Sequence, residues 1–141
     1  MRALKEVVLE GRCVSSGRAE GEAIVTKDSI MFNGGINPRT GVVTERGHEL
    51  EGQSVKDKIL VFPYSKGSQG GSDALYQMAM LKVGPRAMIC IKAEGQIAVG
   101  TIMGNIPFVD KLNQNPLEMI RTGDNVEVDA DRGLVKVTRR A

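Results

Sequence analysis

The pattern of hydrophobic and polar positions is clearest in the middle of the chain, where three kinds of segment follow one another. Residues 59–62 are continuously apolar, which is typical of a strand buried on both faces. Pro63 ends this run, and the next nine residues hold three glycines and three serines, a composition that favours a loop. From Ser72 onward, apolar residues recur at helical spacing up to the stop signals Gly84 and Pro85, which predicts a helix of about three turns.

Shorter apolar stretches on both sides of this unit predict further strands. Residues 6–14 alternate between apolar and polar, and residues 23–25 continue after a turn, so we expect the two segments to be antiparallel neighbours. Residues 87–92 form another buried run. We expect this run to be parallel to residues 59–62, with the helix as a right-handed crossover between them.

The last third of the chain adds short elements. Residues 97–102 and 107–109 are short apolar pieces separated by glycine and asparagine. An Asn-Pro pair supplies an N-cap and a first helical residue for a short helix over 116–120. Residues 125–137 alternate on either side of a turn, which indicates a hairpin. The whole pattern predicts one mixed α/β domain over residues 1–141, rich in strands, with one principal helix.

The loop between the central strand and the helix is a candidate anion site. The first turn of a helix has N–H groups without internal partners, and the helix dipole adds partial positive charge there. Glycines let a ligand approach the backbone without meeting a Cβ atom. We therefore expect a phosphate or carboxylate to bind beside the Ser68 hydroxyl. The candidate binding residues are Lys66, Gly67, Gln69, Gly70, Gly71 and Ser72.

Other interpretations of this loop are an ordinary strand-to-helix turn with Ser72 as N-cap, or a known catalytic motif. The loop has no GKS or GKT ending, so it is not a nucleotide P-loop. Ser68 is preceded by Lys66 and Gly67 and followed by Gln69, which does not match the GxSxG elbow of hydrolases.

A second glycine-rich segment, FNGGINPRTGVV, spans residues 32–43. It is interpreted either as a wide loop between strands or as a second wall of the same site, with Gly34 and Gly35 as further binding residues. His48 lies in a polar connection flanked by charges, and we interpret it as an exposed loop residue.

Composition excludes several function classes. The 141 residues are 41% hydrophobic and 26% charged, which is ordinary globular usage. Nineteen basic and 17 acidic residues give a net charge of +2, with the signs interleaved, so there is no basic stripe for nucleic acid. Aromatic residues are only 4%, too few for a stacking platform. No apolar run has the length of a membrane span or signal segment, and we expect a soluble, cytoplasmic protein without membrane contacts.

This sequence has few cysteine and histidine residues that could bind a metal ion or cluster. Cys13 and Cys90 lie far apart in the sequence, and His48 is the single histidine. Iron–sulfur and zinc sites need clustered ligands such as CxxC, so we interpret both cysteines as reduced core residues. Any metal or cluster must then belong to a partner.

Three motifs carry a resemblance to a known family. They are FxGGxxPxTG at residues 32–41, FPxxKGS at 62–68 and GxIPxVD at 104–110, in that order. On these motifs the chain resembles the small subunit of the aconitase X type of dehydratases, roughly from Cys13 to Gly133. The resemblance implies a swivelling domain of two β layers and one α layer. It also implies a large partner subunit, in a heterodimer or higher assembly, that carries an iron–sulfur cluster or iron.

The resemblance further implies an activity. Ser68 would be the proton acceptor of a hydro-lyase that dehydrates (R)-5-phosphomevalonate to trans-anhydromevalonate 5-phosphate in the archaeal mevalonate pathway, and the chain would be inactive without its large subunit. Three positions depart from the family pattern: Ser65 where glycine is usual, Gln69 where a small hydroxyl residue is common, and Asn37 where aspartate is common. These departures concern substrate contacts rather than Ser68.

The same residues are compatible with three other functions. The chain could be the small domain of a cis-3-hydroxy-L-proline dehydratase, a non-catalytic anion-binding module, or a structural lid on the partner. The loop by itself cannot make Ser68 a strong base. A helix terminus contributes about 2 kcal/mol at most, whereas one pKa unit corresponds to about 1.36 kcal/mol. More positive charge must come from Lys66 and from the partner.

Overall fold

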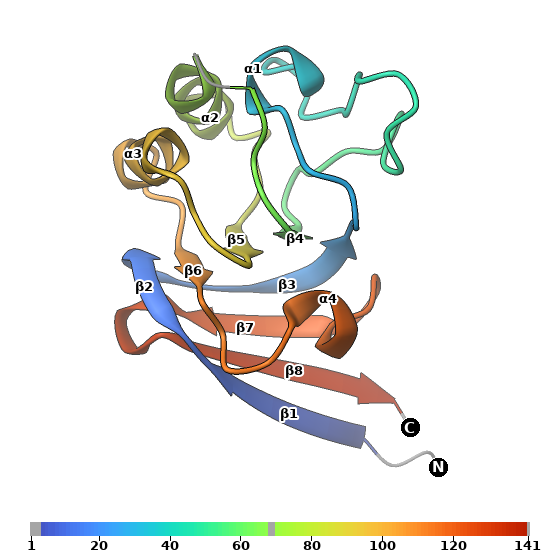
Figure 1. Ribbon diagram of the computed structural model, residues 1–141, viewed down its shortest axis with the longest axis vertical. Coiled ribbons are helices and arrows are strands. Elements are labelled where there is room, and N and C mark those ends of the chain that lie inside the picture. Colours follow the sequence, from blue (N-terminus) through green and yellow to red (C-terminus); the bar gives the residue numbers. More distant parts are fainter. Residues whose placement is uncertain (1–3, 68–69, 141) are drawn as a thin grey trace.

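The computed structural model describes residues 4–67 and 70–140, with the side chains of 5–67 and 70–139. In this part of the chain eight strands form one sheet in the order β1-β8-β7-β3-β4-β5-β6-β2. The sheet folds over on itself (Figure 1). The strands are β1 (Leu4–Glu10), β2 (Arg12–Ser15), β3 (Arg18–Val25), β4 (Ile59–Phe62), β5 (Ala87–Cys90), β6 (Phe108–Asp110), β7 (Asn125–Asp129) and β8 (Leu134–Arg140). The helices are α1 (Phe32–Gly35), α2 (Gly71–Met80), α3 (Gly95–Met103) and α4 (Pro116–Met119), with a 3₁₀ turn η1 (Ala130–Arg132).

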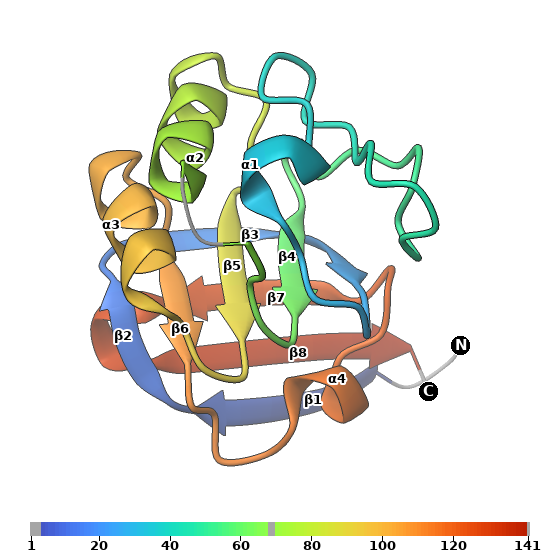
Figure 2. The ribbon, with the colours of Figure 1, turned by 45° about the horizontal axis from the view of Figure 1, so that its top comes forward.

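The sheet has an inner and an outer part that share β3. The outer part is antiparallel, with β1, β8 and β7 joined to residues 18–22 of β3. The inner part joins residues 23–25 of β3 to the parallel strands β4, β5 and β6, with β2 antiparallel at its edge. The helices α2 and α3 lie on the side of the inner strands away from β7 and β8 (Figure 2). The result is three layers, helix, inner sheet and outer sheet.

Two hydrophobic cores separate these layers, and β4 contributes to both. Leu60 and Phe62 point into the helix-side core, where the Phe62 ring contacts Phe32 at a centroid distance of 5.5 Å. Ile59 and Val61 point into the core between the two sheet parts. All four residues are buried, as expected for a strand covered on both faces. This double burial fixes the end of β4, and with it the start of the glycine-rich loop.

Several sequence-based predictions are confirmed. The pairing of β4 with β5 is parallel, with α2 between them in the chain. Asn115 caps α4 through its side-chain oxygen, which accepts from the Leu117 N–H at 2.9 Å. The strands β7 and β8 form the predicted antiparallel hairpin around η1.

The predicted strand over residues 6–14 is wrong in two respects. Gly11 divides it into β1 and β2, and neither pairs with β3: β1 pairs with β8, and β2 pairs with β6. Apolar alternation shows which face of a strand is buried but not which strand lies beside it. At Gly11 the chain passes from the outer to the inner sheet, and a Cβ there would lie 2.4 Å from the Asp110 carbonyl oxygen.

The prediction of one principal helix missed α3. Residues 97–102, interpreted as a short apolar piece, lie inside α3, which has nine residues against ten for α2. A short apolar run does not distinguish a strand from a buried helix. The helix α2 also ends earlier than Gly84, because Lys82 adopts a left-handed conformation with φ of 59°. The Val83 N–H then donates to the Met78 carbonyl at 3.0 Å, which closes the helix end.

Two single-residue interpretations are also wrong. His48 is buried, with 6% of its surface exposed, because the turn folds its ring back onto the chain. The Leu50 N–H donates to His48 Nδ1 at 3.0 Å, so the ring proton is on Nε2, which donates to the Ser29 carbonyl at 3.0 Å. Cys13 is exposed rather than in the core, because its side chain points outward from the edge strand β2, whereas Cys90 is buried.

Candidate functional site

A small cavity lies where the glycine-rich loop meets the starts of α2 and α3. Its volume is about 130 Å³. Three segments that are distant in the sequence form its wall, one around residue 32, one around residue 67 and one around residue 96. The lining residues are Met31, Phe32, Asn33, Lys66, Gly67, Gly71, Glu94, Gln96 and Ile97. The loop and the FNGGINPRTGVV segment therefore border the same cavity, although the segment lines it with Phe32 and Asn33 rather than with Gly34 and Gly35.

The amino end of α2 borders the cavity through Gly71. Its N-cap is Gly70, which adopts φ of 81° and provides no side-chain hydrogen bond, so the interpretation of Ser72 as N-cap is wrong. The first N–H groups of a helix need partners from outside the helix. The left-handed φ favours glycine at this position, and a Cβ there would lie 2.5 Å from Asn33 Nδ2, so the Asn33 side chain would have to move.

The amino end of α3 is closed by its own side chain. Glu94 is the N-cap, and its carboxylate accepts from the Ile97 N–H at 3.0 Å. Two helix ends thus border the cavity, and in the described residues only that of α3 is capped by the side chain of its own N-cap residue. Sequence reasoning missed Glu94 and Gln96, because α3 itself was not recognised. The signal was a glutamate three residues before the first apolar position of the run.

The GxIPxVD motif holds the start of α3 in place through Asp110, which does not itself line the cavity. Asp110 is fully buried and accepts two hydrogen bonds from Arg12, at 2.9 and 2.8 Å. The same carboxylate accepts from the Ala93 N–H at 2.7 Å. Ala93 directly precedes Glu94, so Asp110 fixes the connection that leads into α3.

Close packing of the two helices sets the width of the cavity. A Cβ at Gly100 of α3 would lie 2.8 Å from the Ser72 Cα and 3.0 Å from the Ser72 carbonyl oxygen. Real Cβ atoms do not approach backbone atoms so closely, and backbone cannot rotate away as a side chain can. Gly100 therefore allows α2 and α3 to touch at the point where α2 begins.

We expect Gly100→Ala to force the two helices apart and to destabilise the protein by about 1–3 kcal/mol, the usual cost of overpacking. Thermal unfolding followed by circular dichroism measures the effect. The matched control is Gly95→Ala in the same helix, where nothing lies within 4 Å of the added Cβ. An equal or smaller loss for Gly100→Ala than for Gly95→Ala would contradict this packing argument.

Lys66 lines the cavity and is held by an acidic residue that the sequence did not reveal. Its Nζ atom lies 2.6 Å from Glu45 Oε2. The second oxygen, Glu45 Oε1, is buried and has no hydrogen-bond partner among the described residues. A Cβ at Gly35 would lie 3.3 Å from this oxygen. Gly35 therefore leaves room for Glu45 behind Lys66.

The remaining predicted site residues are placed as follows. Ser68 and Gln69 lie outside the described residues. Gly67, with φ of 73°, lines the cavity, and a Cβ there would meet Met31 Cγ at 3.1 Å. Ser72 is the second residue of α2 and contacts α3. Gly34 and Gly35 lie in α1, next to the lining residues rather than among them.

The described residues do not fit an iron ion or an iron–sulfur cluster. In the described ranges no three His, Cys, Asp or Glu side chains gather into a group that could hold a metal. Burial and the nearby Asp110 carboxylate raise the pKa of the Cys90 thiol, so it stays protonated, whereas a metal ligand must be a thiolate. Desolvation also raises the pKa of Cys13.

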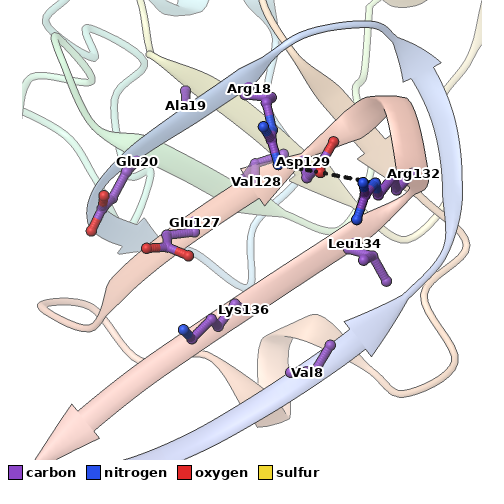
Figure 3. Close-up of a pocket in the computed structure, with 10 residues that line it drawn as sticks. All are labelled: Val8, Arg18, Ala19, Glu20, Glu127, Val128, Asp129, Arg132, Leu134 and Lys136. Carbon is purple, nitrogen blue, oxygen red and sulfur yellow. Dashed lines mark hydrogen bonds and ion pairs between the residues drawn. The ribbon is translucent and has the colours of Figure 1, made fainter.

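A larger hollow lies on the outer sheet, away from the helices. Its volume is about 520 Å³, and β1, β3, β7 and β8 contribute its residues (Figure 3). Arg18 and Arg132 both point toward Asp129, and the Arg18 Nη2 to Asp129 Oδ2 distance is 2.8 Å. Lys136, Glu20 and Glu127 also line the hollow, so its three basic and three acidic residues balance in charge. None of the predicted site residues that the structure describes lies in this hollow.

The comparisons with known proteins agree with this fold. The family described as "Aconitase X swivel domain" matches residues 8–137. The chain belongs to this family. The aconitase X resemblance and the swivelling three-layer domain inferred from the motifs are thereby confirmed. Among the described residues, no helix is long and apolar enough to cross a membrane.

Similar aconitase X proteins cover almost the whole chain. The phosphomevalonate dehydratase small subunit of Methanocella arvoryzae is 48% identical over 92% of this chain and 98% of its own length. The protein of the same name from Archaeoglobus fulgidus is 47% identical over 89% and 95%. The crystal structure of Thermococcus kodakaraensis aconitase X in its holo form superposes with a TM-score of 0.88 at 41% identity, over 93% of this chain and 98% of that one. The relatives' names imply a large partner subunit.

Proposed function

We propose that this chain is the small subunit of a heteromeric hydro-lyase that dehydrates (R)-5-phosphomevalonate to trans-anhydromevalonate 5-phosphate and water. Relatives that share 40–48% of its residues over most of its length carry the name phosphomevalonate dehydratase small subunit. These names support phosphomevalonate over the hydroxyproline alternative. The observation that carries the proposal is the cavity that the amino end of α2 and Lys66 both line, which suits an anionic substrate.

The chain would contribute binding groups and a proton acceptor. The elimination removes a proton from the carbon next to the substrate carboxylate and hydroxide from the neighbouring carbon while a C=C bond forms, and the proton and hydroxide together make the one water released. The family resemblance gives the proton to Ser68, which follows Lys66 and Gly67 in the chain. The N–H groups at the start of α2 would hold an anionic group of the substrate.

The large subunit would complete the site. We propose that it holds the iron or iron–sulfur cluster, since the side chains described above do not fit one. It must also supply positive charge. A helix end provides about 2 kcal/mol at most, and Lys66 is already paired with Glu45, so this chain provides little net charge to stabilise a deprotonated serine.

We therefore predict that the isolated small subunit has no dehydratase activity. The measurement is product formation from (R)-5-phosphomevalonate by the small subunit alone, by the large subunit alone and by the two together. Activity is expected only in the mixture. Turnover by the small subunit alone would contradict the proposed division of the site.

The same preparation tests the substrate. The complex is assayed with (R)-5-phosphomevalonate and, in parallel, with cis-3-hydroxy-L-proline. Dehydration of the phosphorylated compound is expected. Dehydration of hydroxyproline instead would overturn the proposed function, whereas the chain would still belong to the aconitase X family.

A further inference from the structure

Most of the exposed large hydrophobic residues lie on two neighbouring helices. Eight such residues are exposed in the described part of the chain, and six of them lie in α2, in α3 or directly after α2. We call these six the helix-face patch: Tyr76, Met80, Leu81, Val99, Ile102 and Met103. The other two are Val8 in β1 and Tyr64 in the glycine-rich loop. Single exposed apolar residues are ordinary on a protein surface, whereas a group of them marks an interaction site.

The helix α3 has apolar residues on both of its faces. Ile97 and Gly100 belong to the buried face. Val99, Ile102 and Met103 are three and four residues apart, so they share the exposed face. None of the nine residues of α3 is charged. A surface helix usually has polar and charged residues on the side away from the core, so α3 has the composition of a helix that another protein covers.

The helix α2 continues this surface. Tyr76 and Met80 are four residues apart and both exposed, and Asp73 is the only charged residue among the ten of α2. The two helices lie side by side (Figure 2), and a Cβ at Gly104, directly after α3, would lie 2.9 Å from Ala79 Cβ. The exposed faces of the two helices therefore form one surface. It is rich in methionine and poor in charge, as the centres of protein interfaces are.

The cavity lies at one end of this surface. Gly71 at the start of α2 lines it, and so do Gln96 and Ile97 at the start of α3. Val99 follows Gln96 within one helical turn. A large subunit that completes the site must therefore meet both helices at their amino ends.

The size of a stable interface indicates how far this contact extends. About 800 Å² per partner is usual, which corresponds to a surface about 30 Å across. The ten residues of α2 span only about 15 Å, so an interface that includes the mouth of the cavity has room to reach the far ends of both helices. The exposed apolar residues indicate this direction. Among the described residues of β1, β7 and β8, only Val8 is a large hydrophobic residue that is exposed.

We propose that the helix-face patch is a docking surface for the large subunit, which covers α2 and α3 from the cavity to their carboxyl ends. The inference rests on the proposed function, because it names where the partner that completes the same site is bound. The facing surface of the large subunit is then apolar as well, since a charged group would lose its hydration there without gaining a counter-charge. The outer sheet around Val8 lies outside this interface.

The test measures the dissociation constant of the two subunits by biolayer interferometry, with Met80→Lys, Met80→Glu or Ile102→Lys in the small subunit. Each variant buries an unpaired charge in an apolar contact and should weaken binding at least about tenfold. Both signs of charge should act alike at Met80, because burial rather than repulsion is the cause. Val8→Lys makes the same kind of change on the outer sheet and should leave the dissociation constant within about twofold.

Several results would overturn the proposal. One is wild-type affinity in the Met80 and Ile102 variants, and another is an equal loss of affinity in Val8→Lys. A second copy of this chain on the patch would appear in analytical ultracentrifugation as a dimer of the isolated small subunit that Met80→Lys dissociates, with unchanged binding to the large subunit. All these positions are exposed in the free chain, so circular dichroism should show the same thermal unfolding for every variant.

Methionine oxidation gives an answer without any substitution. Met80 and Met103 are 63% and 49% exposed and should react with hydrogen peroxide in the isolated chain, whereas Met78 is fully buried and should not. Assembly with the large subunit should protect Met80 and Met103, and equal oxidation in the free and the assembled chain would overturn the proposal.

These measurements separate the docking surface from the proposed function. A complex that forms through the patch but converts no (R)-5-phosphomevalonate would overturn the proposed function and keep the docking surface. An active complex in which the patch variants bind as tightly as the wild type would do the reverse. No binding between the wild-type subunits would overturn both.

Discussion

Ser68→Ala is expected to reduce the dehydration rate of the two-subunit complex by about 10²–10⁴-fold, the usual contribution of a positioned acid–base group. The hydroxyl is proposed to accept the proton released next to the substrate carboxylate, and alanine has no group that can do so. Because the reaction cannot proceed without proton removal, kcat should fall while the KM for (R)-5-phosphomevalonate changes little. Steady-state kinetics on the purified complex measures both quantities.

The control for this prediction is Ser16→Ala, which removes a hydroxyl from an exposed position between β2 and β3. Its activity should equal that of the wild type. Both variants should also assemble with the large subunit to the same extent, which size-exclusion chromatography checks. Activity of Ser68→Ala within a few-fold of the control would leave the loop as an anion-binding element without a role in proton transfer.

The central unit of the fold could be predicted from local patterns. The run at β4 is apolar at every position, and a strand covered on both sides needs that composition. Gly70 and Gly71 precede apolar positions at helical spacing, so the loop and α2 were recognisable. The same reasoning predicted Lys66 and Gly67 as anion-binding residues. Both line the cavity, and anion binding there stays a prediction.

The rest of the site depends on contacts between distant segments, which local patterns do not contain. Glu45 looks like any charged loop residue in the sequence, yet it lies 2.6 Å from Lys66. Glu94 lines the cavity because α3 packs against α2, and the local sequence around Glu94 does not indicate that packing. The split at Gly11 was hidden for a similar reason, since the obstacle to a side chain there is the carbonyl oxygen of Asp110.

The glycines of the three motifs illustrate how tightly these segments are joined. Gly41 ends the FxGGxxPxTG motif and adopts φ of 77°. A Cβ at this position would lie 2.2 Å from the Val83 carbonyl oxygen, in the connection between α2 and β5. The Gly41 carbonyl accepts from the Val55 N–H at 2.9 Å, so the backbone is also held from a third segment. The motif therefore ends where three parts of the chain meet.

Gly41→Ala is expected to destabilise the protein by about 2–5 kcal/mol, the largest stability loss that we predict. The left-handed conformation costs a residue with a Cβ about 1–2 kcal/mol, and overpacking against a neighbour adds about 1–3 kcal/mol. For a chain of this size each kcal/mol lowers the midpoint of thermal unfolding by about 4 °C, so a decrease of about 8–20 °C is expected. Circular dichroism during heating measures it.

Gly52→Ala separates the two causes of this loss. Gly52 has a similar φ of 83°, but nothing lies within 4 Å of its added Cβ, so it reports the conformational cost alone. Its loss should be about 1–2 kcal/mol, well below that of Gly41→Ala. Equal losses in the two variants would mean that the conformation, and not the contact with Val83, explains the glycine at position 41. The difference between them measures how firmly the FxGGxxPxTG segment is attached to the end of α2, the helix whose other end borders the cavity.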